Sequence, residues 1–228
     1  MWRDALLVAG KDLRIERRSR VATAQVLPFA VLVLALFAFA LDTDGRILRI
    51  SAPGLFWIAV LLASMLAAQR SFAVEVDDRG LDGMRLSGLD PAGIFLGKAG
   101  AVAIELLVLE GLLLLGTALL YDSPLRGSGA VLLVVTCVLA TAGLASVGAI
   151  YGALSAGLRG RETLLPLLYL PVTAPVLLTG AKAMEAAMGV TPGLQVGEGW
   201  PWVRLLGVFA VLYVAFGVLA FGALVEET

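Results

Sequence analysis

Six long apolar runs dominate this 228-residue chain. A membrane-spanning helix needs about 20 mostly apolar residues, because hydrocarbon offers a free backbone group no hydrogen-bond partner. The second run, Pro53–Ala68, is shorter than this, and we expect its helix to continue toward Phe72. We therefore expect an all-α, polytopic membrane protein with six transmembrane helices in a single domain over residues 1–228. The expected spans are Val21–Leu41, Pro53–Ala68, Ala101–Leu120, Ala130–Ala153, Leu164–Ala181 and Val203–Leu224.

The composition supports a membrane protein and excludes several kinds of chemistry. Hydrophobic residues make up 60% of the chain and charged residues 15%, whereas a soluble domain has roughly 45–50% and about 25%. A net charge of −1 argues against binding to nucleic acid. The chain has no histidine and one cysteine, Cys137. We therefore expect no disulfide, no catalytic residue and no metal or cofactor held by this chain alone.

The Lys and Arg residues are divided unequally between the two sets of loops. If the N-terminus is inside, the inner segments hold twelve of them: Arg3, Lys11, Arg14, Arg17, Arg18, Arg20, Arg70, Arg79, Arg85, Lys98, Arg159 and Arg161. The outer segments hold five: Arg46, Arg49, Arg126, Lys182 and Arg204. Because cytoplasmic loops carry an excess of these residues, we expect both termini in the cytoplasm. Trp57, Trp200 and Trp202 would then lie near the outer interface, which favours tryptophan.

Residues 1–20 have the pattern of an amphipathic helix. Trp2, Leu6, Ala9 and Leu13 recur at helical spacing, and the cations occupy the rest of the wheel. Such a helix lies in the headgroup region of the inner leaflet, where its cations meet anionic lipid. The same cations also serve as a topology signal, and the two interpretations are compatible.

Residues 72–91 contain the charged stretch VEVDDRGLDGMRLSGLDP between two apolar runs. Its glycines each cost about 1 kcal/mol relative to alanine in a helix, so any helix here is short and needs an external contact. One alternative is a solvated cytoplasmic loop, but such a loop would not need apolar side chains every few residues. A docking element for a soluble partner explains both features. Its expected rim is Asp78, Arg79 and Asp82, and its expected anchors are Leu81 and Leu86.

Two glutamates, Glu105 and Glu110, fall within the third expected span. Ionisable groups at membrane depth are costly and tend to face the interior of a bundle. Five residues apart on a helix places them roughly 140° apart, which argues against a paired-carboxylate catalytic site. For Glu105, a polar position on a translocation pathway and a structural hydrogen bond to a neighbouring helix both remain open. For Glu110, the pattern favours the structural hydrogen bond.

The fifth span contains three prolines, Pro166, Pro171 and Pro175. Each lacks an N–H and crowds the preceding turn, so carbonyl groups lose their helical partners and must find others. A bent helix that gates or faces a substrate is the functional interpretation. The alternative is a static kink used for packing. Three prolines within ten residues favour the functional interpretation.

The pair Gly97-Lys98 is the nearest approach to a phosphate-binding loop, G-x-x-x-x-G-K-[ST]. Ala92 stands where the first glycine belongs, and Ala99 replaces the hydroxyl residue. We therefore expect this chain to bind no ATP itself. If ATP is used, a partner chain must bind it.

Taken together, the spans, the basic N-terminal helix and the acidic insert resemble the permease subunits of ATP-binding-cassette exporters. Within that group, RSFAVEVDDRGLDGMRL and LRGRETLLPLLYLPVTAPVLLTGA resemble the haem exporter protein B family of the cytochrome c maturation system. The insert departs from that family at 80–83, where GLDG replaces an expected threonine and a glutamate-glutamine pair. The positions that match the insert pattern are Glu75, Asp78, Gly80, Leu81, Asp82, Leu86, Leu89 and Lys98.

The resemblance implies a non-catalytic permease domain in the bacterial inner membrane, with the insert as the coupling helix that docks on an ATPase subunit. It also implies a haem-handling, tryptophan-rich membrane subunit as a partner, ATP bound by the ATPase subunit, and haem as the substrate. One rival hypothesis keeps the transporter class and changes the cargo to a lipid, polysaccharide or drug. Another is a proton-coupled carrier or intramembrane enzyme that uses Glu105.

Overall fold

Helices make up almost all of the computed structural model, which describes residues 1–19, 22–41, 45–77, 83, 87–123, 126–156 and 161–226. Within these ranges, the description leaves out the side chains of residues 22–23, 73–77, 155–156, 161–165 and 225–226. No strand occurs in the described residues. The elements are α1 (Trp2–Ser19), the π-helix η1 (Ala22–Val26), α2 (Leu27–Leu41), α3 (Gly45–Asp77), α5 (Pro91–Leu120), the 3₁₀ turn η2 (Gly127–Gly129), α6 (Ala130–Ala156), α7 (Arg161–Met188), the 3₁₀ turn η3 (Val196–Gly199) and α8 (Trp200–Glu226).

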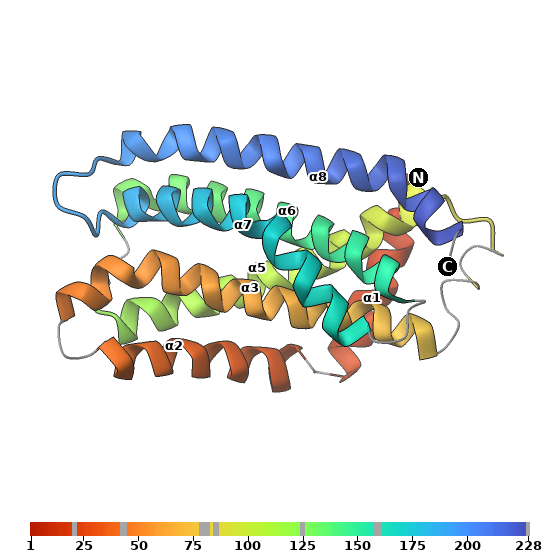
Figure 1. The fold of residues 1–228 in the computed structure, drawn as a ribbon, viewed down its shortest axis with the longest axis horizontal. Coiled ribbons are helices and arrows are strands. Elements are labelled where there is room, and N and C mark those ends of the chain that lie inside the picture. The colour runs from red at the N-terminus through yellow and green to blue at the C-terminus, as the bar shows by residue number, and fades with distance from the viewer. Residues whose placement is uncertain are drawn as a thin grey trace.

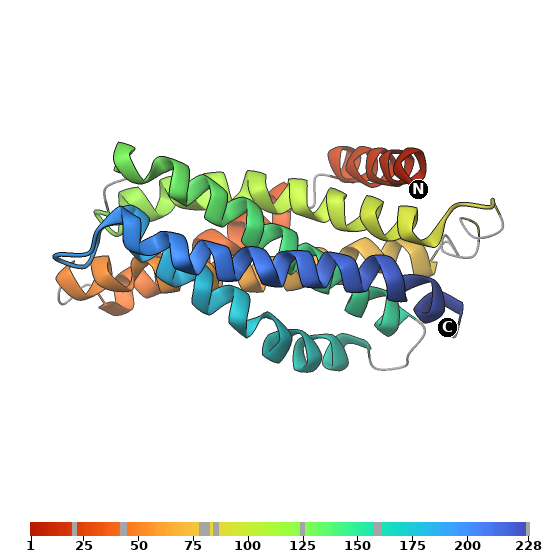
Figure 2. The same cartoon turned by 90° about the horizontal axis from the view of Figure 1, so that it is seen from above.

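Six of these helices are long and apolar enough to cross a membrane, which confirms the predicted number of spans. They lie lengthwise beside one another, with α6 packed against α3, α5, α7 and α8. The seventh helix, α1, runs at a steep angle to the others and packs on α5 (Figures 1 and 2). The start of the chain and the end of α8 lie at the same end of the bundle (Figure 1).

Three spans are longer than predicted from the apolar runs. Helix α3 begins at Gly45 and continues to Asp77, and α7 covers Arg161–Met188. Helix α5 begins at Pro91, ten residues before the predicted boundary, because Asp90 caps it: the Asp90 Oδ1 atom accepts from the Ala92 N–H at 3.2 Å. The additional turns at the ends of these helices contain charged residues, so they were not part of the apolar runs from which the spans were predicted. The connection between α3 and α5 is therefore residues 78–90, shorter than the predicted 72–91.

The core of the bundle is formed mainly by α3, α5, α6 and α7. Its largest buried side chains include Phe56, Trp57 and Tyr169. By contrast, α2 and α8 expose large apolar side chains such as Phe39, at 81%, and Leu219, at 83%. Such surfaces are stable in hydrocarbon, so α2 and α8 are peripheral spans.

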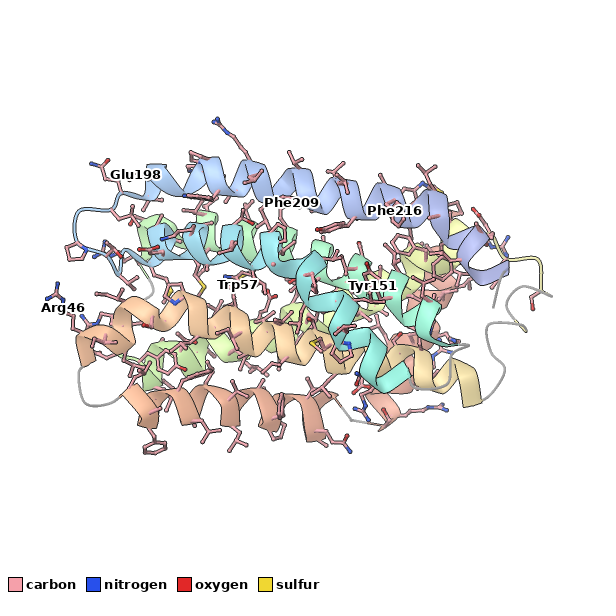
Figure 3. All side chains as sticks on the ribbon, in the orientation of Figure 1. Arg46, Trp57, Tyr151, Glu198, Phe209 and Phe216 are labelled. Atoms are coloured by element: carbon pink, nitrogen blue, oxygen red, sulfur yellow. The ribbon has the colours of Figure 1, made fainter. Side chains whose placement is uncertain are left out.

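The prediction that Trp57 lies at the membrane interface is wrong. Trp57 is 1% exposed and packs edge-on against Phe56, with 5.3 Å between the ring centroids. On α7, Gly180 leaves room for the ring, because an added Cβ would lie 2.9 Å from Trp57 Cε2. Trp200 and Trp202, in contrast, are 37% and 40% exposed at the start of α8. Trp57 can be buried because Gly180 leaves space for its ring on the neighbouring helix α7. Figure 3 labels Trp57 among the side chains of the bundle.

Candidate functional site

The predicted docking residues are attached to the end of the bundle that also carries α1 and both termini. Asp78, Arg79, Gly80, Leu81, Asp82 and Leu86 lie outside the described residues, as does the side chain of Glu75. The backbone of Glu75 belongs to the last turns of α3. We call residues 78–90, which connect α3 to α5, the docking segment. The structure shows where this segment leaves α3 and where it enters α5, and the roles of its residues stay predictions.

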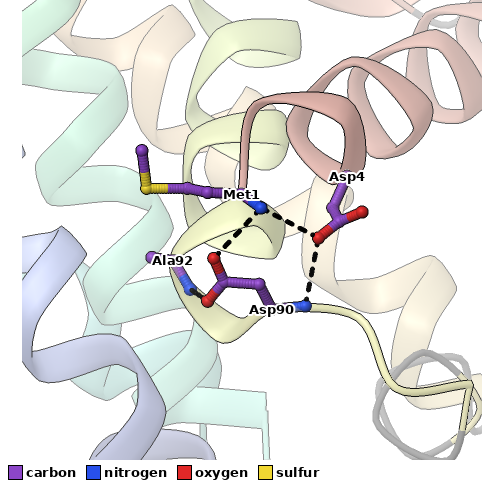
Figure 4. A network of polar contacts seen from close by, with 4 residues as sticks. All are labelled: Met1, Asp4, Asp90 and Ala92. Carbon is purple, nitrogen blue, oxygen red and sulfur yellow. Dashed lines mark hydrogen bonds and ion pairs between the residues drawn. The ribbon is translucent and has the colours of Figure 1, made fainter.

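The docking segment returns to the bundle at Asp90, which contacts the first turn of α1 (Figure 4). The Asp90 backbone N–H donates to Asp4 Oδ2 at 3.4 Å. The Met1 amino group lies 3.2 Å from Asp4 Oδ2 and 3.3 Å from Asp90 Oδ2. The amino group beside Asp4 lowers the pKa of that carboxyl. These contacts fasten the end of the docking segment to α1.

Helix α1 packs closely on α5 because two glycines of α5 leave room for its backbone. A Cβ added at Gly93 would lie 2.8 Å from the Met1 carbonyl oxygen, and one at Gly97 would lie 2.7 Å from the Ala5 carbonyl oxygen. Ala5 and Val8 are buried in this contact. Ala5 and Val8 therefore form the face of α1 toward the bundle. The predicted apolar stripe lies on another side, where Trp2 and Leu6 are 71% and 75% exposed.

A buried lysine joins α1, α3 and α5 just below the docking segment. Lys98 of α5 is 1% exposed, and its Nζ atom lies 3.0 Å from Asp12 Oδ2 of α1. The same ammonium donates to the Ser71 carbonyl of α3 at 2.8 Å. It also lies 5.2 Å from the centroid of the Phe72 ring. Because one cation contacts all three helices, they form one connected unit at this end.

The two glutamates of α5 point to different neighbours, as their spacing predicted. Glu110 is 1% exposed, and its Oε1 atom accepts from the Thr141 hydroxyl of α6 at 2.5 Å. This contact agrees with the structural interpretation of Glu110. Glu105 is partly buried, and the charges that act on it include Asp12 and Lys98. It therefore lies toward the charged group around α1, and its role in translocation stays a prediction.

Helix α7 is bent but continuous through its three prolines (Figures 1 and 2). The Tyr213 hydroxyl of α8 donates to the Val172 carbonyl at 2.6 Å, so α8 is bonded to α7 beside the bend. The carbonyl groups that lose a helical donor to the prolines are instead those of Glu162, Leu167 and Pro171. Pro171 is exposed, and Pro166 and Pro175 are partly buried. The prolines therefore shape the helix and line no buried interior. The gating role proposed for them is not tested by these contacts.

The buried face of α7 is polar where it meets α3 and α6. Tyr169 is fully buried, and its hydroxyl donates to the Leu144 carbonyl of α6 at 3.0 Å. The same hydroxyl lies 2.8 Å from the Ser64 hydroxyl of α3. Thr173 and Thr179 donate back to carbonyls within α7. Tyr169 thus ties the bent helix to two central helices.

These contacts are suited to mechanical coupling. In the described ranges, no three His, Cys, Asp or Glu side chains gather as a metal site would require. The polar groups form separate links between pairs and triplets of helices. What Lys98, Glu110 and Tyr169 share is that each one joins neighbouring helices.

Sequence reasoning assigned no site role to Asp12, Lys98 or Tyr169. For Asp12 a signal exists, because it follows Ala5 and Val8 at helical spacing and so places an acid on an apolar stripe. Lys98 entered only as part of a family pattern. Its partner could not be deduced, because the contact depends on how α1 folds back onto α5. Tyr169 gave no signal beyond being a tyrosine within an apolar span.

The sequence that forms these six spans and the N-terminal helix matches a known family. Residues 3–228 match the family described as CcmB protein. The chain belongs to the CcmB protein family.

Relatives named Heme exporter protein B support this assignment over nearly the full length. The relative from Pseudomonas aeruginosa is 30% identical over 221 residues, which is 94% of each chain. That from Haemophilus influenzae is 33% identical over 96% of this chain and 95% of its own. That from Paracoccus denitrificans is 33% identical over 82% of this chain and 85% of its own. This member of the CcmB protein family is therefore similar to the first two relatives over nearly its whole length.

Proposed function

We propose that this chain is the membrane-spanning permease subunit of an ATP-binding-cassette transporter complex that delivers haem to the periplasm for c-type cytochrome biogenesis. The observation that carries the proposal is the match to the CcmB protein family, with relatives named Heme exporter protein B, over nearly the whole chain. The proposed partners are a cytoplasmic ATPase subunit and a haem-handling, tryptophan-rich membrane subunit. The proposed location is the bacterial inner membrane, with both termini in the cytoplasm.

The mechanism in this proposal is the transfer of motion from the ATPase subunit to the spans. The chain has no phosphate loop of the G-x-x-x-x-G-K-[ST] kind, so in this proposal the partner supplies the energy. Residues 78–90 would receive the motion, because they connect α3 to α5. Lys98 would pass it to α1 and α3 together, since it contacts both helices. Tyr169, which bonds to α6 and lies beside Ser64 of α3, would couple the central spans to the bent helix α7.

Deletion of the gene tests the cargo. If the chain serves haem delivery, membranes of the deletion strain lose c-type cytochromes, as measured by haem staining after denaturing gel electrophoresis. Re-expression of the wild-type chain restores them. Normal c-type cytochromes in the deletion strain would contradict the haem assignment and favour another cargo.

Affinity purification from native membranes tests the ATPase partner. We expect an ATPase subunit to co-purify with the wild-type chain and to be lost with the double variant Asp78→Lys/Asp82→Lys. Glu198→Lys is the matched control, because Glu198 is exposed at the opposite end of the bundle (Figure 3). Recovery of the chain alone from wild-type membranes would overturn the proposal.

Replacement of Glu105 separates the transporter subunit from a proton-coupled carrier. If the chain is a permease subunit, Glu105→Gln retains ATPase co-purification, and the isolated chain transports nothing without ATP. A carrier that uses Glu105 predicts activity from the isolated chain in vesicles, and predicts that Glu105→Gln abolishes it. Transport driven by a pH gradient in ATPase-free vesicles would therefore refute the permease assignment.

A further inference from the structure

The outer side of α1 carries a groove that neither the contact with α5 nor the docking segment uses. It has a volume of about 310 Å³ and is lined by Leu6, Leu7, Gly10, Lys11, Arg14, Ile15 and Arg18. All of these residues belong to α1. The groove is therefore a feature of one helix surface. Helix α1 itself crosses the spans at the edge of the bundle (Figure 2).

The chemistry of the groove is apolar at its base and cationic along its side. Leu6 and Leu7 are 75% and 57% exposed, so they would be in contact with water unless something covers them. Arg14 and Arg18 are exposed. They are four residues apart, and so lie on the same side of the helix. None of the residues that line the groove is an acid. Lys11 lines the groove too, and its Nζ atom lies 3.2 Å from Asp12 Oδ1.

Gly10 makes room in the middle of the groove. A Cβ added at this position would meet no described heavy atom within 4 Å, so the space above the backbone is open. A glycine within a helix costs about 1 kcal/mol relative to alanine. No close contact with another element requires a glycine here. The space it leaves can admit part of a ligand between Leu6 and Arg14.

We propose that this groove binds a single anionic phospholipid, with the phosphate between Arg14 and Arg18 and the start of an acyl chain over Gly10 against Leu6 and Leu7. Charge complementarity selects the occupant, because Arg14 and Arg18 line the groove and none of its lining residues is an acid. The apolar base selects a lipid over a free phosphate, which would leave Leu6 and Leu7 uncovered. The position of α1 beside the spans places the groove within reach of the headgroup region.

Native mass spectrometry of the full chain tests the proposal. The protein is equilibrated in detergent with equal amounts of phosphatidylglycerol and phosphatidylcholine that carry the same acyl chains, and retained lipid is counted. We expect one phosphatidylglycerol to be retained preferentially. Arg14→Gln and Arg18→Gln should each weaken retention about fivefold, since a cation near an anionic lipid surface contributes roughly 1 kcal/mol.

Two further variants test the groove and the fold. Gly10→Leu keeps every charge but fills the groove, so it should also lower phosphatidylglycerol retention. The double variant Arg46→Gln/Arg204→Gln removes two exposed cations at the other end of the bundle, and should retain the lipid as the wild type does. Each variant is compared only if it elutes as wild type in size-exclusion chromatography.

Three outcomes would overturn the proposal. Equal retention in all variants would mean that the lipid binds only as nonspecific annular lipid. Loss with the arginine variants but not with Gly10→Leu would mean that the groove is not the site. Displacement of phosphatidylglycerol by inorganic phosphate at matched ionic strength would mean that the cations bind free phosphate.

Discussion

At the scale of single residues, Lys98 carries the largest number of inter-element contacts among the charged side chains described above. A buried ion pair is weak support for stability, because desolvation of both charges can exceed their attraction. Lys98 adds a hydrogen bond to the Ser71 carbonyl and a contact with the Phe72 ring. Its value therefore lies in fixing where α1 and α3 meet α5.

We predict that Lys98→Met destabilises the protein by up to about 3 kcal/mol, because it removes the bond to the Ser71 carbonyl and leaves the Asp12 carboxylate, 11% exposed, with Lys11 as its remaining partner. The measurement is the free energy of unfolding in detergent, from titration with a denaturing detergent. Lys182→Met is the control, because the Lys182–Glu185 pair has a lysine that is 55% exposed and should contribute at most about 1 kcal/mol. Equal effects of the two variants would contradict the assignment of Lys98.

At the scale of elements, close approach of helices decides the architecture more than helix propensity does. Helix α5 has glycines at 93, 97, 100, 111 and 116, yet only at Gly93 and Gly97 would an added Cβ lie closer than 3.0 Å to another helix. Two glycines in one helix therefore have opposite consequences. Gly97 allows α1 to pack, and Gly100 only lowers helix stability.

This difference gives a paired prediction on α5. Gly97→Ala places a Cβ 2.7 Å from the Ala5 carbonyl oxygen, so it should displace α1 and expose its basic residues to trypsin. Gly100→Ala meets nothing within 4 Å and should stabilise the helix by about 1 kcal/mol. Limited proteolysis of the full chain at the α1 arginines measures both. Similar cleavage rates for the two variants would count against the packing described for α1.

A second prediction at this scale concerns the bend in α7. Pro171→Ala restores a backbone N–H that can donate to the Leu167 carbonyl, so it should straighten α7 and stabilise the protein, by up to about 3 kcal/mol. If the bend is needed for function, the same variant should lower the yield of c-type cytochromes. Pro192→Ala, at an exposed position in the loop after α7, is the control. Full cytochrome yield with a stabilised Pro171→Ala would favour the static kink.

At the scale of the whole molecule, the two ends of the bundle differ in chemistry. One end carries α1, the attachment points of the docking segment and both termini (Figure 1). The other carries the connections α2–α3, α5–α6 and α7–α8. Arg49 pairs there with Asp122, and Gln195 and Glu198 form a capping box at the turn η3. The first end is therefore where the predicted docking segment joins the bundle.

We predict that these ends lie on opposite sides of the inner membrane, with the docking segment in the cytoplasm. The check is labelling with a membrane-impermeant maleimide in intact cells. Gln195→Cys should be labelled, and Ser87→Cys should be labelled only after the cells are opened. Both positions are exposed, and the native Cys137 is buried at 6% exposure, so background labelling should be low. Labelling of Ser87→Cys in intact cells would reverse the orientation.

Much of the fold could be predicted from sequence because each span must satisfy its own backbone in hydrocarbon. The number of spans, the separate helix α1 and the different faces of Glu105 and Glu110 all follow from length and helical geometry. The ends of the helices were predicted less accurately. Gly45–Ala52 and Pro91–Gly100 are helical, but they contain polar or small residues and so fall outside the apolar runs. The bend of α7 was predicted from its prolines, and its partner Tyr213 was not.

The sequence by itself determined that this chain is a six-span helical membrane protein, because apolar run length sets what can cross a bilayer. It also predicts a docking segment between the second and third spans. Tertiary structure alone decided that Trp57 is a core residue, that α1 packs through Ala5 and Val8, and that Lys98 meets Asp12. The physical reason is that such contacts join residues far apart in sequence, and depend on the gaps that glycines leave in neighbouring helices.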